Sequence, residues 1–389
     1  MQIYQVGGAV RDRLLGLPVQ DRDWVVVGAT PEQMAARGFA PVGRDFPVFL
    51  HPDTHEEYAL ARTERKSGRG YRGFVVQASP EVTLEQDLAR RDLTINAIAA
   101  PQDWTLLDGL NDAGKEAALI DPFGGLRDLR AKVLRHVSEA FREDPVRILR
   151  VARFAARFHD FALAPETLAL MRAMVQEGEA AHLVPERVWQ ELARGLMQAH
   201  PARMLEVLRD CGALAVILPQ ADGPWRIWPR ALAPLERAAR LHAPLSVRFA
   251  CLVRGLALLG AICERWRVPM ELRALAGLLA RERQAIHDSG ALDAAGVLSL
   301  LTRCDAIRKP ERFAQALLAC QCDALLADAY PVQPRLLGAL AAARSVETAR
   351  IAQTAQAQGA QGLAVGQAIA HARTQAVAQW LQGHNGGGL

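Results

Sequence analysis

Few features of this 389-residue sequence point to a disulfide-bonded or membrane protein. Its six cysteines are scattered, without a disulfide framework or the paired spacing of a zinc site, and they indicate a reducing, cytoplasmic setting. The most apolar long run, residues 249–263, is interrupted by Arg254 and is shorter than the roughly 18 to 20 residues of a membrane span. No basic-then-apolar leader precedes the first predicted strand, so we expect a soluble, cytoplasmic protein.

Aromatic residues and excess charge of one sign are also scarce. Aromatic residues make up only 6% of the chain, whereas half of its residues are hydrophobic, which is typical of a helical protein rich in alanine and leucine. The formal net charge of +4 does not by itself indicate a nucleic-acid partner, so the distribution of the charges matters more than their sum. The length allows two or more domains with a sizeable core.

Strand-like segments lie only in the first third of the chain, and the rest follows a helical period. The pattern predicts strands at residues 3–6, 24–27, 48–50, 57–61 and 106–107, and helices from about residue 138 onward. We therefore predict an α+β protein with a small mixed β-sheet head, residues 1–137, a helical neck, residues 138–218, and a helical body and tail, residues 219–389. Residues 63–74 combine four basic residues with three glycines, and we expect a loop without regular structure there.

The opening of the chain carries the most informative pattern. Gly7-Gly8 separates a predicted strand from a short helix, and Asp21-Arg22-Asp23 enters the next strand. A glycine turn at a helix N-terminus lets phosphate approach the backbone closely, and two carboxylates on one face of a strand suit Mg²⁺. Each half has a plainer reading, as an ordinary turn and as a solvated strand entry.

The two halves together resemble a known head domain. Gly7-Gly8-x-x-Arg-Asp-x-Leu-x-Gly followed by Asp21-x-Asp23 is similar to the polymerase-β-type nucleotidyltransferases, in the class II branch that contains bacterial CCA-adding enzymes and poly(A) polymerases. The resemblance implies transfer of C, C and A from CTP and ATP to the tRNA 3′ end without a nucleic-acid template. The alternatives are a poly(A) polymerase of the same branch, or a binding-only RNA module with a decayed site.

The resemblance also implies site residues in the head. Asp21 and Asp23 would be catalytic and hold two Mg²⁺ ions, one activating the primer 3′-hydroxyl and one neutralising the triphosphate. Glu57 is our candidate for a third carboxylate. Gly8, Arg11, Arg91 and Asp92 would bind the incoming ATP or CTP, since guanidinium groups match phosphate oxygens. Intact aspartates and Arg91 argue against a decayed site.

A second cluster lies in the predicted neck. Residues 143–157 place Arg150, Arg153 and Arg157 on one helical face, and three aligned arginines require an anion. Asp144 before a proline is typical of an ordinary helix N-cap. In the resembled family, however, Asp144 and Arg147 read the base edge that C and A share, while Arg150 adds a phosphate or base contact.

Four other segments complete the prediction. Arg187 and Glu191, four residues apart, would brace the neck helix together. Residues 121–129 form either a hinge or a plain turn between head and neck. An insertion at about residues 100–119 looks like a surface loop, and the loop at residues 63–74 favours addition of A as well as C.

The second half is expected to bind tRNA without further chemistry. Many bacterial relatives carry a metal-binding His-Asp pair there, but this sequence has Arg254-Gly255 at the corresponding place, and a His-rich stretch after it is missing. His242 and His287 stand alone, and a lone histidine is more often a surface or capping residue than a metal ligand. We expect no hydrolase activity, no membrane contact and no obligatory protein partner.

Overall fold

A computed structural model describes residues 1–42, 47–66, 74–104, 112–218, 232–256, 259–324 and 330–384. The chain divides into two compact units, Met1–Pro219 and Gln220–Leu389, and each is described by itself. The strand predicted at residues 106–107 lies outside the described residues.

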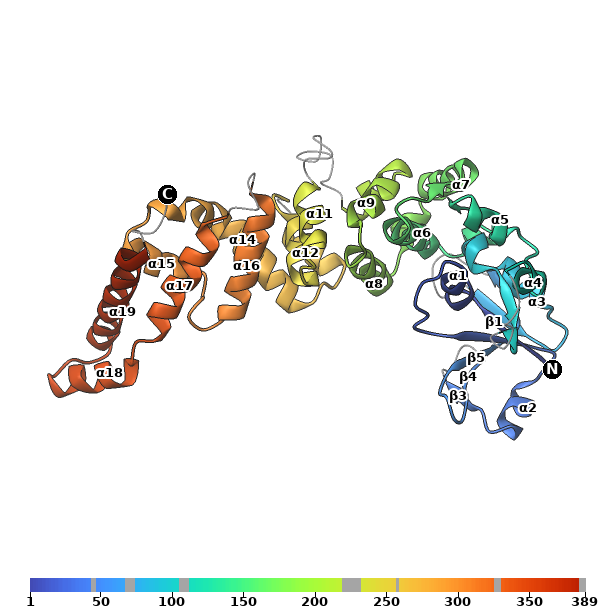
Figure 1. Ribbon diagram of the computed structural model, residues 1–389, viewed down its shortest axis with the longest axis horizontal. Helices are drawn as coiled ribbons and strands as arrows, with labels where there is room; N and C mark the ends of the chain where they lie inside the picture. Colours follow the sequence, from blue (N-terminus) through green and yellow to red (C-terminus); the bar gives the residue numbers. More distant parts are fainter. Residues whose placement is uncertain are drawn as a thin grey trace. The chain divides into compact units, whose positions relative to one another are not determined.

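The first unit contains a six-stranded mixed sheet (Figure 1). The strand order is β3-β4-β5-β2-β1-β8, with β2 and β5 parallel and the other neighbours antiparallel. This arrangement confirms the predicted α+β head. The strands of the sheet are β1 (Gln2–Val6), β2 (Asp23–Val27), β3 (Ala40–Val42), β4 (Val48–Leu50), β5 (Glu57–Leu60) and β8 (Ala99–Pro101).

The sheet has a core on each face because successive side chains of a strand point to opposite sides. Val25 packs on one face with Leu88 of α3 (Leu84–Ala89), and Trp24 packs on the other with Met34 of α2 (Pro31–Ala36). Both helices begin with a capping box, which fixes their starts at Thr30 and Thr83.

Two predicted loops are wrong in their described parts, while residues 67–73 and 105–111 of these segments lie outside the described residues. Residues 63–66 belong to strand β6 (Arg62–Lys66), and residue 74 begins strand β7 (Phe74–Ala78). These two strands pair with each other in a two-stranded ribbon. Because β6 does not join the main sheet, its sequence is polar and did not indicate a strand. The insertion at residues 100–119 is not a surface loop throughout. Ala100 is fully buried in β8, which pairs with β1, and α4 (Asp112–Ala117) follows.

Helices make up most of the remainder of the first unit. α6 packs against α8 and α9, and the face opposite its aligned arginines is buried at Ile148, Leu149, Ala152 and Ala155. The expectation that strands end within the first third is wrong for one short parallel pair, β9 (Val133–Leu134) and β10 (Ala162–Leu163). The helices are α1 (Gly8–Leu14), α5 (Gly125–Arg130), α6 (Val146–Arg157), α7 (Pro165–Gln176), α8 (Pro185–Leu196), α9 (Pro201–Asp210) and α10 (Ala213–Ile217), with the 3₁₀ turns η1 (Thr94–Asn96), η3 (Glu139–Glu143) and η4 (Glu179–His182).

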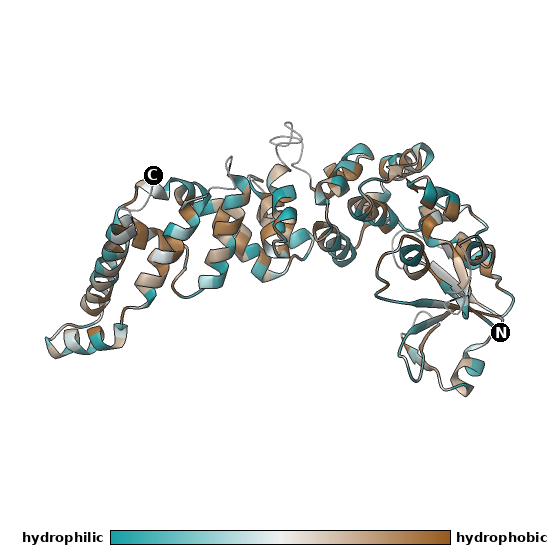
Figure 2. Ribbon diagram, viewed as in Figure 1, coloured by the Kyte–Doolittle hydropathy of each residue, from teal (hydrophilic) through white to brown (hydrophobic). Residues whose placement is uncertain are grey.

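The described part of the second unit is helical. α12 packs on α11, α14 and α16, and the hydrophobic residues coloured brown in Figure 2 are frequent on α12 and α16. All six cysteines are free and buried. No described helix is both long enough and apolar enough to cross a membrane. The helices are α11 (Ala233–Arg240), α12 (Leu245–Val253), α13 (Leu259–Arg265), α14 (Met270–His287), α15 (Ala294–Arg303), α16 (Pro310–Asp323), α17 (Val332–Arg344), α18 (Thr348–Ala357) and α19 (Leu363–His384), with the 3₁₀ turn η6 (Asp288–Ala291).

Candidate active site

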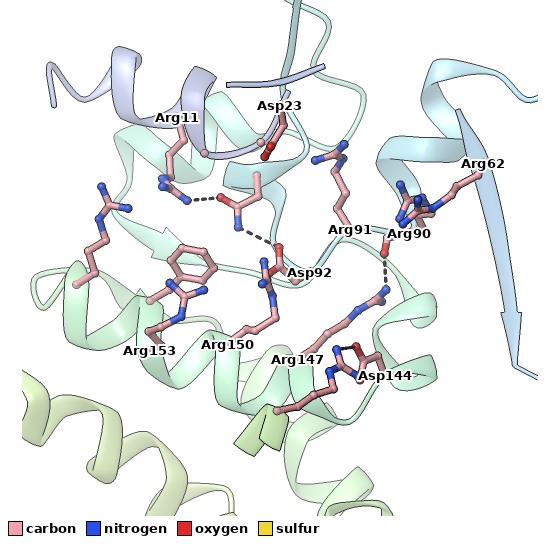
Figure 3. A pocket seen from close by; sticks show the side chains of 16 residues that line it. Arg11, Asp23, Arg62, Arg90, Arg91, Asp92, Asp144, Arg147, Arg150 and Arg153 are labelled. Carbon is pink, nitrogen blue, oxygen red and sulfur yellow. Dashed lines mark hydrogen bonds and ion pairs between the residues drawn. The ribbon is translucent and has the colours of Figure 1, made fainter. Parts of the chain in front are cut away.

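A cavity of about 620 Å³ in the first unit collects nearly all of the predicted site residues (Figure 3). Nine arginines and three aspartates line it, so the wall carries an excess of positive charge that suits a polyanion. Of the residues that we predicted to be catalytic, metal-binding or nucleotide-binding, only Asp21 and Glu57 are not among the described residues that line this cavity. The lining residues are Gly7, Gly8, Arg11, Asp23, Arg62, Arg90, Arg91, Asp92, Asn96, Asp144, Arg147, Arg150, Arg153, Phe154, Arg157 and Arg187.

The two predicted catalytic carboxylates lie at the start of β2. Asp23 is the first residue of the strand, whereas Asp21 precedes it, which corrects the expectation that both lie within a strand. Burial by the surrounding protein raises the pKa of Asp23 above its ordinary value. The positive charge of Arg91 opposes this shift, and the negative charge of Asp21 adds to it. Glu57 pairs in register with Asp23 on the neighbouring strand β5.

The donor set fits a hard divalent cation. Within the described ranges, no three His, Cys, Asp or Glu side chains gather into a complete metal site. Two carboxylates are nevertheless what Mg²⁺ commonly takes from a protein, with water and substrate phosphates as the other ligands. Asp23 and Asp21 therefore offer hard oxygen ligands at the start of β2.

The glycine turn brings backbone, carboxylate and guanidinium together. Gly7 has φ of 71°, and a Cβ at this position would lie 3.2 Å from Arg91 Nη1 and 3.6 Å from Asp23 Oδ2. Gly8 then begins α1. A residue without a side chain is therefore required at Gly7 both for its conformation and for the space above it.

Arg11 is buried beneath this turn, with only 3% of the residue exposed. Its Nε donates to Asp12 Oδ1 at 2.9 Å and its Nη1 donates to Asn96 Oδ1 at 2.5 Å. The guanidinium also lies about 5 Å from the ring centres of Phe154 and Phe158. Burial lowers the pKa of Arg11, although the charge of Asp12 opposes this.

Arg91 is hydrogen-bonded to a buried carboxylate, Asp87, that was not predicted from the sequence. Asp87 is fully buried, and its Oδ2 accepts from Arg91 Nη2 at 3.2 Å while its Oδ1 accepts from Arg90 Nη2 at 2.7 Å. Although burial opposes it, the charges of Arg90 and Arg91 lower the pKa of Asp87. Arg91 Nε is buried with no hydrogen-bond partner among the described residues. The spacing of four residues on a helix could have indicated this pair.

Asp92 is 6% exposed and is enclosed by protein donors. Its Oδ2 accepts from Arg150 Nε at 2.7 Å, and its Oδ1 accepts from Asn96 Nδ2 at 2.9 Å. Although burial opposes it, the charge of Arg150 and these hydrogen bonds hold the pKa of Asp92 well below its ordinary value. Asp92 itself raises the pKa of Arg150.

The predicted base-reading pair lies on one wall of the cavity. Asp144 accepts two hydrogen bonds from Arg187, at 3.1 and 2.7 Å, and one from the backbone of Val146 at the start of α6. Arg147 donates to the carbonyl oxygens of Ala140 and Arg90, at 2.5 and 2.6 Å. Arg187 and Glu191, which we predicted to brace the neck, join α8 to the start of α6 and to α6 itself, because Arg187 binds Asp144 and Glu191 binds Arg153.

The aligned arginines of α6 already have protein anions. Arg150 pairs with Asp92, Arg153 with Glu191 at 2.5 Å, and Arg157 with Asp12 at 2.9 Å. The inference that this face needs an anion is correct, but carboxylates from α1, α8 and the segment after α3 satisfy it. None of these partners could be read from the helical period of α6 alone.

Comparison with known proteins identifies the family. The Poly A polymerase head domain model matches residues 3–135, and the model described as a probable RNA and SrmB-binding site of polymerase A matches residues 160–223. The chain is 61% identical over 419 aligned positions to the Multifunctional CCA protein of Paracidovorax citrulli (strain AAC00-1), covering 98% of both chains. This chain belongs to the CCA protein family. A relative with the same name from Burkholderia multivorans (strain ATCC 17616 / 249) is 54% identical and covers 98% and 99% of the two chains.

A solved CCA-adding enzyme has the same fold. The structure of the Bacillus stearothermophilus CCA-adding enzyme in complex with CTP aligns with a TM-score of 0.67 at 24% identity, over 98% of this chain and 93% of that one. The 419-position alignment is longer than this CCA protein's 389 residues, so the Paracidovorax relative has residues that this chain lacks. Whether they are the His-rich stretch expected after Gly255 stays a prediction.

Proposed function

We propose that this protein adds C, C and A to the 3′ end of tRNA from CTP and ATP, releasing pyrophosphate, without a nucleic-acid template. The observation that carries the proposal is one cavity in which Asp23, the Gly7-Gly8 turn and Arg91 meet, in a chain 61% identical to a CCA protein over nearly its whole length. The near full-length identity favours this activity over a poly(A) polymerase. The reducing cytoplasm is the compartment that we propose for it.

We assign the metal and phosphate ends of the reaction to the head. Asp21 and Asp23 are the residues that would hold Mg²⁺, with Glu57 as the candidate third carboxylate beside Asp23. The ion supplies charge neutralisation on the triphosphate and a lower pKa for the attacking hydroxyl. Arg91, anchored by Asp87 and retaining a donor at Nε, binds the phosphates next to the backbone of Gly7 and Gly8.

We assign base selection to Asp144 and Arg147. A carboxylate accepts from the exocyclic amino group that C and A share, and a guanidinium donates to the neighbouring ring acceptor. Uracil and guanine present the opposite polarity and would leave buried groups unpaired. The two hydrogen bonds from Arg187 fix the plane of the Asp144 carboxylate, so Arg187 serves as its positioning residue.

Single-nucleotide reactions test the function. A tRNA that lacks its CCA end is incubated with the protein, Mg²⁺ and either CTP alone, ATP alone or both, and product lengths are read on a sequencing gel. The proposal predicts two added residues with CTP alone and three with both nucleotides. A long tail made from ATP alone would identify a poly(A) polymerase, and unchanged length in every lane would support a binding-only module.

A further inference from the structure

Six polar side chains form a chain of five hydrogen bonds across the wall of the cavity, and helix α6, which carries both end residues, closes this chain into a ring. The ring leaves α6 at Arg150, crosses the segment between α3 and η1, passes through α1 and returns to α6 at Arg157. In the order of the residues listed next, the donor–acceptor distances between successive members are 2.7, 2.9, 2.5, 2.9 and 2.9 Å. The members are Arg150, Asp92, Asn96, Arg11, Asp12 and Arg157.

Asn96 is the only neutral member of this ring. It is 5% exposed, and it lies between the carboxylate of Asp92 and the guanidinium of Arg11. A guanidinium only donates and a carboxylate only accepts, so the amide must turn its oxygen to Arg11 and its nitrogen to Asp92. Among the common buried polar side chains, an amide provides both functions at this length without adding a charge.

This one amide fixes donors at two ends of the cavity. Through Arg11 it is linked to the glycine turn, because the backbone N–H of Arg11 donates to the carbonyl oxygen of Gly7 at 3.2 Å and Arg11 Nη2 would lie 3.3 Å from a Cβ placed at Gly8. Through Asp92 it sets the position of the Arg150 guanidinium on α6. Figure 3 shows Arg11 and Arg150 on either side of the hydrogen-bonded link that ends at Asp92.

We infer that Asn96 is a positioning residue for nucleotide binding, coupling the phosphate-binding turn above α1 to the recognition helix α6 through Asp92. The inference rests on the proposed function, because its readout is the use of CTP and ATP. Asn96 acts through Asp92 and Arg11 and does not need to touch the nucleotide.

A neighbouring residue provides a matched control. Thr94 lies in the same 3₁₀ turn, is 2% exposed and donates its hydroxyl to buried Asp128 at 2.8 Å, outside the ring. Both N96A and T94V remove a buried hydrogen bond from η1. We expect both to lower the unfolding temperature, but only N96A to raise the apparent KM for CTP and ATP, by about tenfold, the change that corresponds to 1.4 kcal/mol.

A double-mutant cycle then separates positioning from direct contact. If Asn96 acts through Asp92 and Arg11, introducing N96A into the D92A protein and, separately, into the R11A protein should change KM by clearly less than the roughly tenfold expected in wild type, because one of its two links is already broken in each. A tenfold effect that persists in both D92A and R11A would mean direct nucleotide contact and would overturn the inference. N96S, which keeps a smaller donor and acceptor, is measured beside N96A and carries the cycle if N96A does not fold.

The controls keep this test independent of the proposed function. A wild-type protein and T94V that both add CCA while N96A matches T94V in KM would overturn only the role of Asn96. A wild-type protein that adds no nucleotide would overturn the proposed function itself.

Discussion

Each unit contains a cluster of arginines and aspartates, but the two clusters have different roles. In the first unit, Asp23 faces a cavity lined by nine arginines, and its pKa is raised. In the second unit, Asp323 at the end of α16 pairs with Arg254 at 2.7 Å and also with Arg283, and its side chain is 13% exposed. Although burial opposes it, hydrogen bonding to His287 and the charges of the arginines lower the pKa of Asp323.

The difference lies in whether the charges are matched within the protein. Asp323 accepts two guanidinium groups, and Tyr330 hydrogen bonds to His287 beside it at 3.1 Å, so the cluster ties α12, α14 and α16 together. Asp23 lies beside a second carboxylate and below a glycine turn. Burial raises the pKa of Asp23, whereas the hydrogen bonds and charges of His287, Arg254 and Arg283 outweigh burial at Asp323 and lower its pKa.

The largest expected effect comes from the carboxylates at β2. D23N and D21N should lower the rate of nucleotide addition by several orders of magnitude, because the metal ligands that stabilise the transition state are lost. The unfolding temperature should change little, since neither side chain is in a core. Single-turnover rates with CTP measure the effect, and D53N, at an exposed aspartate outside the cavity, is the matched control. Retention of more than about a tenth of the rate would contradict the metal assignment.

Removing the charge of Asp323 should instead lower the stability of the second unit. D323N should destabilise the second unit by about 2 kcal/mol at neutral pH, because two guanidinium groups lose their charged acceptor. A lowered native pKa stabilises the fold above the ordinary aspartate value of about 3.9, and this contribution is lost as the pH falls. The difference between wild type and D323N should therefore shrink below about pH 4.

Thermal unfolding across pH measures this difference. D305N serves as the control, because Asp305 pairs with Arg312 at 3.2 Å but its side chain is 31% exposed. A pH-independent difference, or an equal cost for D305N, would mean that the Asp323 ion pairs do not carry the stability.

A smaller, qualitative change is expected at the base-reading wall. D144A or R147A should reduce discrimination of CTP and ATP against UTP and GTP by about tenfold, since the mismatched edge no longer leaves a buried group unpaired. Competition between correct and incorrect nucleotides measures the ratio. R187A should shift the ratio in the same direction as D144A. A lower rate with an unchanged ratio would reduce Asp144 and Arg147 to structural anchors.

The smallest effect is expected in an assay for hydrolase activity of the second unit. Arg254 stands at the position where the sequence of many relatives predicts a metal-binding His-Asp pair, and its guanidinium is paired with Asp323. The protein should therefore not hydrolyse 2′,3′-cyclic nucleotides or phosphate monoesters above background with Ni²⁺, Mn²⁺ or Mg²⁺ supplied. Metal-stimulated hydrolysis that survives D23N would reveal an overlooked site.

The sequence predicted the parts of the site that depend on local order. The Gly7-Gly8 turn, Asp23 and Arg91 lie in short motifs, and the polar and apolar faces of α6 follow from its period of 3.6 residues. The ion-pair partners were not predictable, because Arg187 reaches Asp144 across 43 residues and Glu191 reaches Arg153 across 38. Those contacts exist only once α8 packs on α6.

Sequencing of tRNA 3′ ends tests the central claim most directly. A tRNA pool that lacks CCA is incubated with wild-type protein or D23N, with CTP, ATP, UTP and GTP all present, and every product end is read. The account predicts that wild type yields CCA and then stops, whereas D23N leaves the ends unchanged. Runs of A, ends containing U or G in place of C, or CCA addition by D23N at the wild-type rate would contradict it.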